Sequence, residues 1–249
     1  MASVLVPDVL RVYEIYFAAF KNEQMASIIL DVLFPGGVDT PEFRKAHAEN
    51  TVKYWATNAT QYTYKCIHRV TGDILGMLLC DVFLKGKTPE QRKNPGIPWL
   101  QGEQRERAEN ILNPLWEVRD ELWQDQPHIC EFLCNFICFC VQMLIITDCH
   151  VIAVDPKDQG RKAGAFIVKW GIEMGELFAL PIYIESSPTT YGLYEKFGFS
   201  KIKKTITHKA ALMRTEEDIV VPLMVKMPTA AGGISFDDWK DQGYPAWKR

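Results

Sequence analysis

Residues 151–165, VIAVDPKDQGRKAGA, carry a β-branched strand into a short polar loop and then into the start of a helix. The strand ends at Asp155-Pro156, and the loop contains two glycines, Gly160 and Gly164. The helix continues as AFIVKWGIEMGELFAL, in which large apolar residues recur at i, i+4 spacing and predict an amphipathic helix. The residues that define this apolar face are Phe166, Trp170, Met174 and Phe178.

A strand, a glycine-containing loop and a helix together favour anion binding. The first turn of a helix has backbone N–H groups without partners inside the helix, and the helix dipole adds partial positive charge there. A pyrophosphate fits such a place. The loop is not a P-loop, because GxxxxGK[ST] is absent, and it is not a dinucleotide fingerprint, because GxGxxG is absent.

The chain on either side reads as alternating helices and strands. Downstream we expect a strand at PIYIE, a short helix ending at Gly198, and closing strands over 199–207 and 218–227. Upstream we expect helices over 9–20, 22–33 and 40–55, then a hairpin of strands 61–70 and 73–84. A Pro- and Gly-rich loop, 85–99, leads to an acidic helix over 102–123, which is either a solvated helix or a wall that attracts a cationic amine.

The stretch from Val151 to Ile206 closely resembles the acetyl-CoA-binding core of the GCN5-related N-acetyltransferase (GNAT) superfamily. It contains a V-x-P strand end, a Q-x-x-G-x-G/A-like loop, an amphipathic helix, a strand and a Y-E-K-x-G-F helix end, in that order. We therefore expect an α/β (α+β) fold of the kind found in fungal-type small-molecule acetyltransferases. The resemblance implies a mixed, mostly antiparallel sheet flanked by helices, with acetyl-CoA between two splayed central strands.

The resemblance also implies a domain organisation. One N-acetyltransferase domain would cover 1–227, with residues 85–126 as a loop-plus-helix insertion. Residues 228–249 would form an irregular tail.

Acetyl-CoA is the cosubstrate that the resemblance implies. Its pantetheine arm would pair with the backbone of Ile152, Ala153 and Val154, and the N–H near Ala153 would meet the oxyanion. Its pyrophosphate would contact the loop amides of Gln159, Gly160, Arg161, Lys162, Ala163, Gly164 and Ala165. Lys162 stands where the family has its first loop glycine. A positive φ there would cost a few tenths to about 1 kcal/mol, whereas a negative φ would cost little.

The same resemblance suggests catalytic residues. Tyr194 matches the family tyrosine that protonates the departing thiolate, with Tyr191 as a nearby competitor, and a packed aromatic is the alternative for either. Glu185, at the end of PIYIE, is the best-placed base for the amine, and a solvated strand-end glutamate is the equal alternative. His150 is a second candidate for the base.

Composition narrows the function class. The net charge of −3 gives no case for nucleic acid. The longest apolar run, 132–146, is too short to span a membrane. Seven cysteines, five of them within twenty residues, make a poor disulfide framework, so we expect a cytoplasmic protein. The resemblance implies that its partner is a small-molecule or peptide amine, and we expect a monomer or homodimer. The alternative is a catalytically silent acetyl-CoA-binding sensor or scaffold.

Four of the cysteines lie in CEFLCNFICFC, residues 130–140. Its spacing lacks the turn-rich loop of zinc knuckles, so we expect no metal. The segment divides one expected strand, and codons for Cys130-Glu131-Phe132 and Thr147-Asp148 can contain GTGAGT and CAG, common intron ends. We therefore hypothesise that 130–148 is a retained intron. Its removal would take out 18 codons and leave 249 less 18, or 231, residues.

Overall fold

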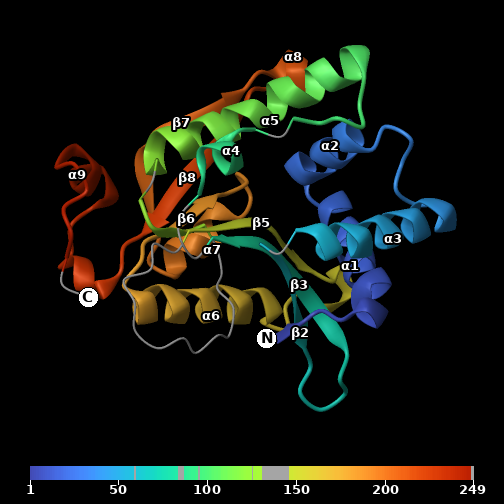
Figure 1. The fold of residues 1–249 in the computed structure, drawn as a ribbon, viewed down its shortest axis with the longest axis horizontal. Coiled ribbons are helices and arrows are strands. Elements are labelled where there is room, and N and C mark those ends of the chain that lie inside the picture. Colours follow the sequence, from blue (N-terminus) through green and yellow to red (C-terminus); the bar gives the residue numbers. More distant parts are fainter. Residues whose placement is uncertain (59, 84–86, 95, 125, 131–145, 248–249) are drawn as a thin grey trace. The chain divides into compact units, whose positions relative to one another are not determined.

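The fold is given by a computed structural model that describes residues 1–247 apart from 59, 84–86, 95, 125 and 131–145. The chain divides into two compact units, which we describe separately. Figure 1 labels most of their helices and strands. The first unit comprises Met1–Val82 and Asp148–Gly171, and the second comprises Phe83–Thr147 and Ile172–Arg249. The organisation predicted from the sequence, one domain over 1–227, stays a prediction.

The described part of the first unit contains three complete α-helices, half of a fourth, two short 3₁₀ helices (η), a β-hairpin and the strand that leads into the loop. Its elements in chain order are β1 (Ala2–Ser3), η1 (Val6–Asp8), α1 (Val9–Lys21), α2 (Gln24–Leu33), α3 (Pro41–Thr57), β2 (Gln61–Ile67), β3 (Ile74–Phe83), β5 (Ile146–Val154), η2 (Pro156–Asp158) and the first half of α6 (Ala163–Phe178). Its strands lie in the order β1-β2-β3-β5, and the pairs β1–β2 and β2–β3 are antiparallel.

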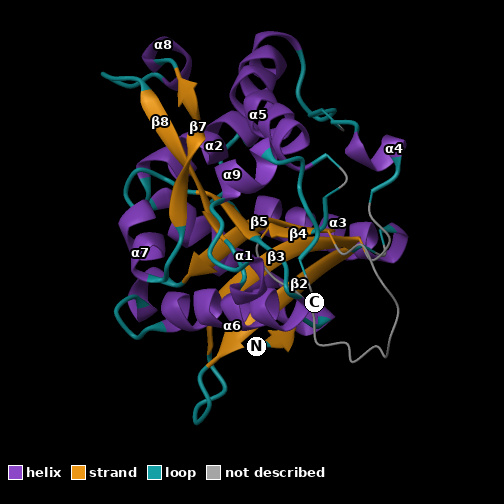
Figure 2. Cartoon of the chain, turned by 90° about the vertical axis from the view of Figure 1, so that its left-hand side faces the viewer, coloured by secondary structure: helices purple, strands orange, loops and turns teal. Residues whose placement is uncertain are grey.

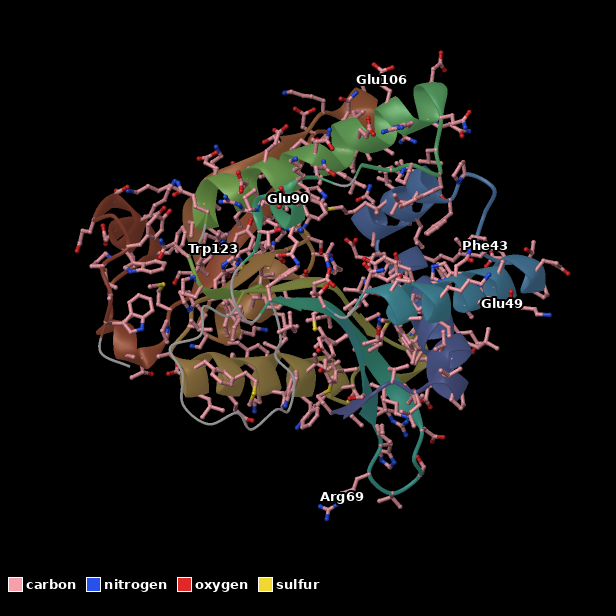
Figure 3. The ribbon with its side chains drawn as sticks, viewed as in Figure 1. Phe43, Glu49, Arg69, Glu90, Glu106 and Trp123 are labelled. Atoms are coloured by element: carbon pink, nitrogen blue, oxygen red, sulfur yellow. The ribbon has the colours of Figure 1, made fainter. Side chains whose placement is uncertain are left out.

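Local sequence explains where these elements begin. Thr40 caps α3 by accepting the Phe43 N–H at 3.1 Å, and Pro41 occupies the first helical position. Gly72, with φ of 78°, closes the hairpin between β2 and β3, and Arg69 projects from its tip (Figure 3). The sequence prediction of this hairpin is confirmed.

The two faces of β3 and β5 pack against different helices. Met77 and Ala153 are buried in a core cluster with residues of α1, α2 and α3. Val154, on the other face of β5, meets α6, where a Cβ at Gly164 would lie 3.5 Å from its Cγ2. Alternation along the strand thus places each side chain on its own face.

The second unit surrounds a smaller set of strands. Its elements are α4 (Pro89–Arg92), α5 (Gly102–Trp123), β4 (His128–Cys130), the rest of α6, β6 (Ile182–Glu185), α7 (Tyr191–Lys196), β7 (Ser200–His208), α8 (Ala210–Met213), β8 (Ile219–Lys226), η3 (Thr229–Ala231) and α9 (Phe236–Asp241). The strand order is β4-β6-β8-β7, with β4 and β6 parallel and the other pairs antiparallel. The paired strands β7 and β8 are drawn in orange in Figure 2.

Helix α5 has a clear buried side. It is therefore not the fully solvated helix that was one of the two interpretations of its sequence. Its buried residues recur at helical spacing: Ala108, Ile111, Leu115, Val118, Leu122 and Trp123. Trp123, at the end of the helix (Figure 3), packs on Tyr183 of β6 with ring centroids 5.7 Å apart. The acidic residues lie opposite, where Glu121 pairs with Lys204 at 2.6 Å.

Three sequence predictions need correction. The 85–99 loop contains the short helix α4, which Thr88 caps. The 228–249 tail is not wholly irregular, because Ser235 caps α9 and the side chains of Phe236 and Trp239 are buried.

The third correction concerns α6. The predicted apolar face begins at Phe166, which is 49% exposed, so this face is not the buried one. The buried residues are Ala163, Ile167, Val168, Gly171 and Gly175. At Gly175 a Cβ would come within 2.8 Å of Ile182, so close packing here depends on the absence of a side chain.

Candidate active site

Strand β5 approaches β3 closely in the first unit. The N–H of Asp155 donates to the carbonyl of Leu75 at 2.9 Å. A Cβ on Gly76 would lie only 2.7 Å from the carbonyl oxygen of Ala153, so glycine is needed for this spacing. The predicted pantetheine-pairing residues Ile152, Ala153 and Val154 therefore lie on a strand whose position is fixed by its neighbour.

Asp155 fixes the direction in which the chain leaves β5. Its carboxylate accepts a hydrogen bond from Arg11 of α1 and another from the N–H of Lys157 at 3.1 Å. Burial alone would raise the pKa of Asp155, but these hydrogen bonds and the positive charges of Arg11 and Lys157 bring it below its usual value. The ionised Asp155 thus ties α1, β5 and the start of the loop together.

The predicted anion-binding loop begins α6. Gly160 has φ of 79° and Lys162 has φ of 67°, so the chain turns twice through the left-handed region before the helix starts at Ala163. The alternative with positive φ at Lys162 therefore applies. Glycine favours this region, whereas a lysine there is strained. The predicted loop residues from Gln159 to Ala165 are contiguous across this turn and the first helical residues.

The three cations of the loop differ in their partners. Arg161 pairs with Asp158 at 2.6 Å, and Lys157 lies 3.5 Å from Asp155. Lys162 is exposed and forms no ion pair with any residue that the structure describes. Its ammonium group is thus the loop charge that is available to an anionic ligand.

Tyr194 and Tyr191 both lie on α7 in the second unit. The Tyr194 ring packs edge-on against Phe199, with centroids 5.7 Å apart. The Tyr191 ring lies under Lys201, whose Nζ is 3.8 Å from the ring centroid. The role predicted for Tyr194 as an acid stays a prediction.

Glu185, at the end of β6, is held in an ion pair. Arg119 of α5 donates from Nε to Oε1 at 2.6 Å and from Nη2 to Oε2 at 2.5 Å. The hydroxyl of Tyr183 donates to Oε1 at 3.2 Å. The side chains of Arg119 and Glu185 are mostly buried, at 17% and 11% exposure respectively. Both carboxylate oxygens are thus occupied by bidentate bonds, which sequence reasoning missed.

His150, the second candidate for the base, is bonded to a carboxylate in the first unit. Its Nε2 lies 2.8 Å from Oδ2 of Asp81 on β3. Oδ1 of Asp81 accepts the hydroxyl of Thr60 at 3.3 Å. Sequence reasoning missed Asp81, although one acidic residue within the apolar strand LLCDVF is an available signal.

Residues 131–145, and with them most of the hypothesised intron, lie outside the described residues. Cys66 and Cys80 are buried, and neither forms a disulfide with a described residue. Within the described ranges, no three His, Cys, Asp or Glu residues gather as metal ligands would. None of the described helices has the length and apolarity needed to cross a membrane.

Comparison with known proteins finds a curated acyltransferase to which the chain is similar. No family model matches the chain. The probable acyltransferase SID5 of Ajellomyces capsulatus is 30% identical over 162 residues, which cover 65% of this chain and 99% of that protein.

Solved structures with a similar fold include two amine acetyltransferases. Polyamine N-acetyltransferase of Drosophila melanogaster has a TM-score of 0.52 at 16% identity, over 91% of this chain and 98% of that one. Arylalkylamine N-acetyltransferase 2 of Aedes aegypti has a TM-score of 0.55 at 15% identity, over 90% and 96%. The C-terminal condensation domain of Ebony has a TM-score of 0.54 at 13% identity, over 91% and 97%. The fold class predicted from the sequence is confirmed.

Proposed function

Because the chain belongs to the GCN5-related N-acetyltransferase superfamily, we propose that it transfers an acetyl group from acetyl-CoA to a primary amine. The acceptor is a small molecule or a peptide, and its nitrogen attacks the thioester carbonyl directly. Its curated relative is a probable acyltransferase, and N-acetyl transfer is the reaction that we propose within that class. The identity of the acyl donor, the acceptor and the roles of the residues are the proposal.

One observation carries the proposal: β5 ends in a loop with two left-handed residues, and α6 begins directly after it. The amides of this first helical turn have no partner inside the helix, and the dipole favours an anion there. The ammonium of Lys162 adds a positive charge, while Arg161 and Lys157 are already paired. A coenzyme A pyrophosphate has the charge and size for this loop.

The reaction needs three things from the chain. The backbone of Ile152, Ala153 and Val154 would pair with the pantetheine arm, and an N–H near Ala153 would stabilise the oxyanion of the tetrahedral intermediate. When the C–S bond breaks, Tyr194 would protonate the coenzyme A thiolate. The intermediate forms on the substrates themselves, so no covalent enzyme intermediate is involved.

The test follows free thiol release from acetyl-CoA. The panel of acceptors holds agmatine, a polyamine, an arylalkylamine and a peptide with a free amino terminus. We expect thiol release with at least one of them, together with thermal stabilisation by coenzyme A. Protein thiols, which would also react with a thiol reagent, are subtracted with a sample that lacks acceptor.

A silent sensor or scaffold is the alternative, and the same experiment separates it. Stabilisation by coenzyme A without thiol release on the whole panel favours that alternative. Absence of stabilisation excludes both. The Ebony condensation domain shows that a similar fold occurs outside the acetyltransferases, so acetyl-CoA is compared directly with longer acyl donors.

A further inference from the structure

We infer that His150, positioned by Asp81, is the base that takes the proton from the acceptor amine. This inference rests on the proposed function and adds the residue that makes the amine nucleophilic. An alkylamine is mostly protonated at neutral pH and then has no lone pair to attack with, so a base is required.

The His150–Asp81 contact defines which nitrogen is available. Nε2 lies 2.8 Å from Asp81 Oδ2, so a neutral imidazole donates its N–H to that carboxylate. The lone pair is then on Nδ1, to which no described residue is bonded. Thr60 holds the other oxygen of Asp81 at 3.3 Å and so limits rotation of the carboxylate. This is the base-and-orienter arrangement that general base catalysis uses.

The surroundings of the pair suit a cationic guest. His150 and Asp81 are 25% and 17% exposed, which leaves them within reach of a small molecule. From α3, Tyr54 faces the same carboxylate: its pKa is raised first by burial and then by the negative charge of Asp81. The negative charge of the Asp81 carboxylate attracts an ammonium ion.

The position along β5 also fits. His150 precedes Ala153 by three residues, which is about 10 Å of extended strand. The His150 imidazole and an acceptor nitrogen bound near Ala153 together span this distance, either in direct contact or through one bridging water. The base and the proposed oxyanion donor therefore belong to the same strand of the same unit.

The protons and electrons balance as follows. Nδ1 of His150 takes one proton from the ammonium, and the freed lone pair forms the new C–N bond. The carbonyl electrons move to oxygen and return as the C–S bond breaks. The second N–H proton of the adduct replaces the one that Tyr194 gives to the sulfur. His150 then releases its proton to solvent, which leaves an amide and coenzyme A.

Glu185, the base that the sequence favoured, is a weaker candidate on contacts. Its two oxygens are both bonded to Arg119, and Tyr183 donates to one of them. A proton from an amine would have to compete with this bidentate pair.

The test compares His150→Gln with Asp81→Asn and Asp81→Glu in full-length protein. We expect His150→Gln to lower kcat by about 100-fold or more, with the KM for acetyl-CoA almost unchanged. In His150→Ala, where the ring is removed, added imidazole should restore part of the rate.

The Asp81 variants separate positioning from a purely structural role. Asp81→Asn should lower kcat about 10-fold with the KM for acetyl-CoA almost unchanged, whereas Asp81→Glu should retain more activity. His68→Gln, in the hairpin turn, is the matched control and should leave kcat unchanged. Thermal stabilisation by coenzyme A in every variant shows that the proteins are folded.

Failure of this inference differs from failure of the proposed function. Wild-type protein that turns over, with His150→Gln retaining its rate, overturns the base alone. Wild-type protein without turnover on the acceptor panel overturns the proposed function and the base with it.

Discussion

Lys162 is a residue at which conformation and charge have opposite effects. Its φ of 67° is in the left-handed region, where a side chain costs roughly 1 kcal/mol compared with glycine. Its ammonium is also the loop cation without an ion-pair partner among the described residues. We interpret the strain as a cost that a bound anion offsets.

Lys162→Gly should therefore stabilise the free protein and weaken coenzyme A binding. The free energy of unfolding should rise by about 0.5 kcal/mol, since relief of strain is partly offset by the flexibility of glycine in the unfolded chain. Urea unfolding with and without coenzyme A measures both effects. Lys169→Gly, within α6, is the control and should destabilise by about 1 kcal/mol. Tighter coenzyme A binding by Lys162→Gly would contradict the argument.

Gly76 is a residue defined by its lack of a side chain. Gly76→Ala would place a Cβ at 2.7 Å from the carbonyl oxygen of Ala153, so β3 and β5 would have to separate. We expect a loss of about 1–3 kcal/mol in unfolding free energy and weaker acetyl-CoA binding, measured by urea titration and thermal shift. Gly36→Ala, where no atom lies within 4 Å, is the control. An unchanged thermal shift with coenzyme A would show that β5 does not contact the ligand.

Helices α1, α2 and α3 meet around an aromatic cluster that contains one histidine. The His47 ring lies 4.5 Å from Tyr13 and 5.1 Å from Phe17, measured between centroids. Phe43, on the same helix α3 (Figure 3), is 5.8 Å away. Burial, aided by the charge of Arg44, lowers the pKa of His47 from 6.5 to about 4. The folded cluster thus holds a neutral imidazole.

The buried His47 in this cluster should make the free energy of unfolding depend on pH between about pH 6.5 and pH 4. Unfolded His47 takes up a proton near pH 6.5 and the folded form only near pH 4, so stability is lost as pH falls between these values. The loss is at most about 3 kcal/mol. His47→Phe should flatten the pH dependence of urea unfolding. His208, whose pKa is also lowered by burial, would leave a remaining slope of the same sign. If unfolding free energy depended on pH as steeply in His47→Phe as in the wild type, His47 would not be the cause of the dependence.

Helix α5 joins strand β6 through the Arg119–Glu185 pair. Arg119→Leu would leave Glu185 in a mostly buried position without its partner, which should cost about 3 kcal/mol. The double variant Arg119→Leu/Glu185→Leu should recover most of that loss, because two apolar groups replace both charges. Chemical unfolding of the two single variants and the double variant completes the cycle. Equal stability of all forms would mean that the pair contributes nothing.

At the scale of the whole molecule, sequence reasoning found most elements and missed most long-range contacts. Thr40-Pro41 and Thr71-Gly72-Asp73 are local signals, and they located α3 and the hairpin correctly. The Arg119–Glu185 pair joins residues 66 apart, which no local pattern reveals.

The candidate site shows the same contrast between local features, which the sequence predicted, and packing, which it did not. The glycines in the sequence were enough to locate the loop, but they did not predict the positive φ of Lys162. On α6 the large aromatic residues dominated the expected face, whereas the buried face uses glycines whose absent side chains admit β6. The tail helix carried a cap signal, Ser235 followed by Asp238, which was overlooked.

The hypothesis of a retained intron concerns the whole chain. Strands β4 and β5 end and begin on either side of the undescribed residues 131–145. We expect transcripts that lack the 18 codons and encode 231 residues, in which the two strands become one. Sequencing of complementary DNA across this region tests this. Transcripts that all retain the 18 codons would refute the hypothesis.

Each compact unit is made of two separate stretches of the chain, and this has a consequence for synthesis on the ribosome. Strand β3 is finished by residue 83, but its partner β5 emerges only after residues 84–145 have been translated. At about 5–20 residues per second the edge of β3 waits on the ribosome for several seconds. During that interval β3 is paired with β2 on one side only, and its other edge is open to other nascent chains, so this protein should depend on chaperones while it is being made.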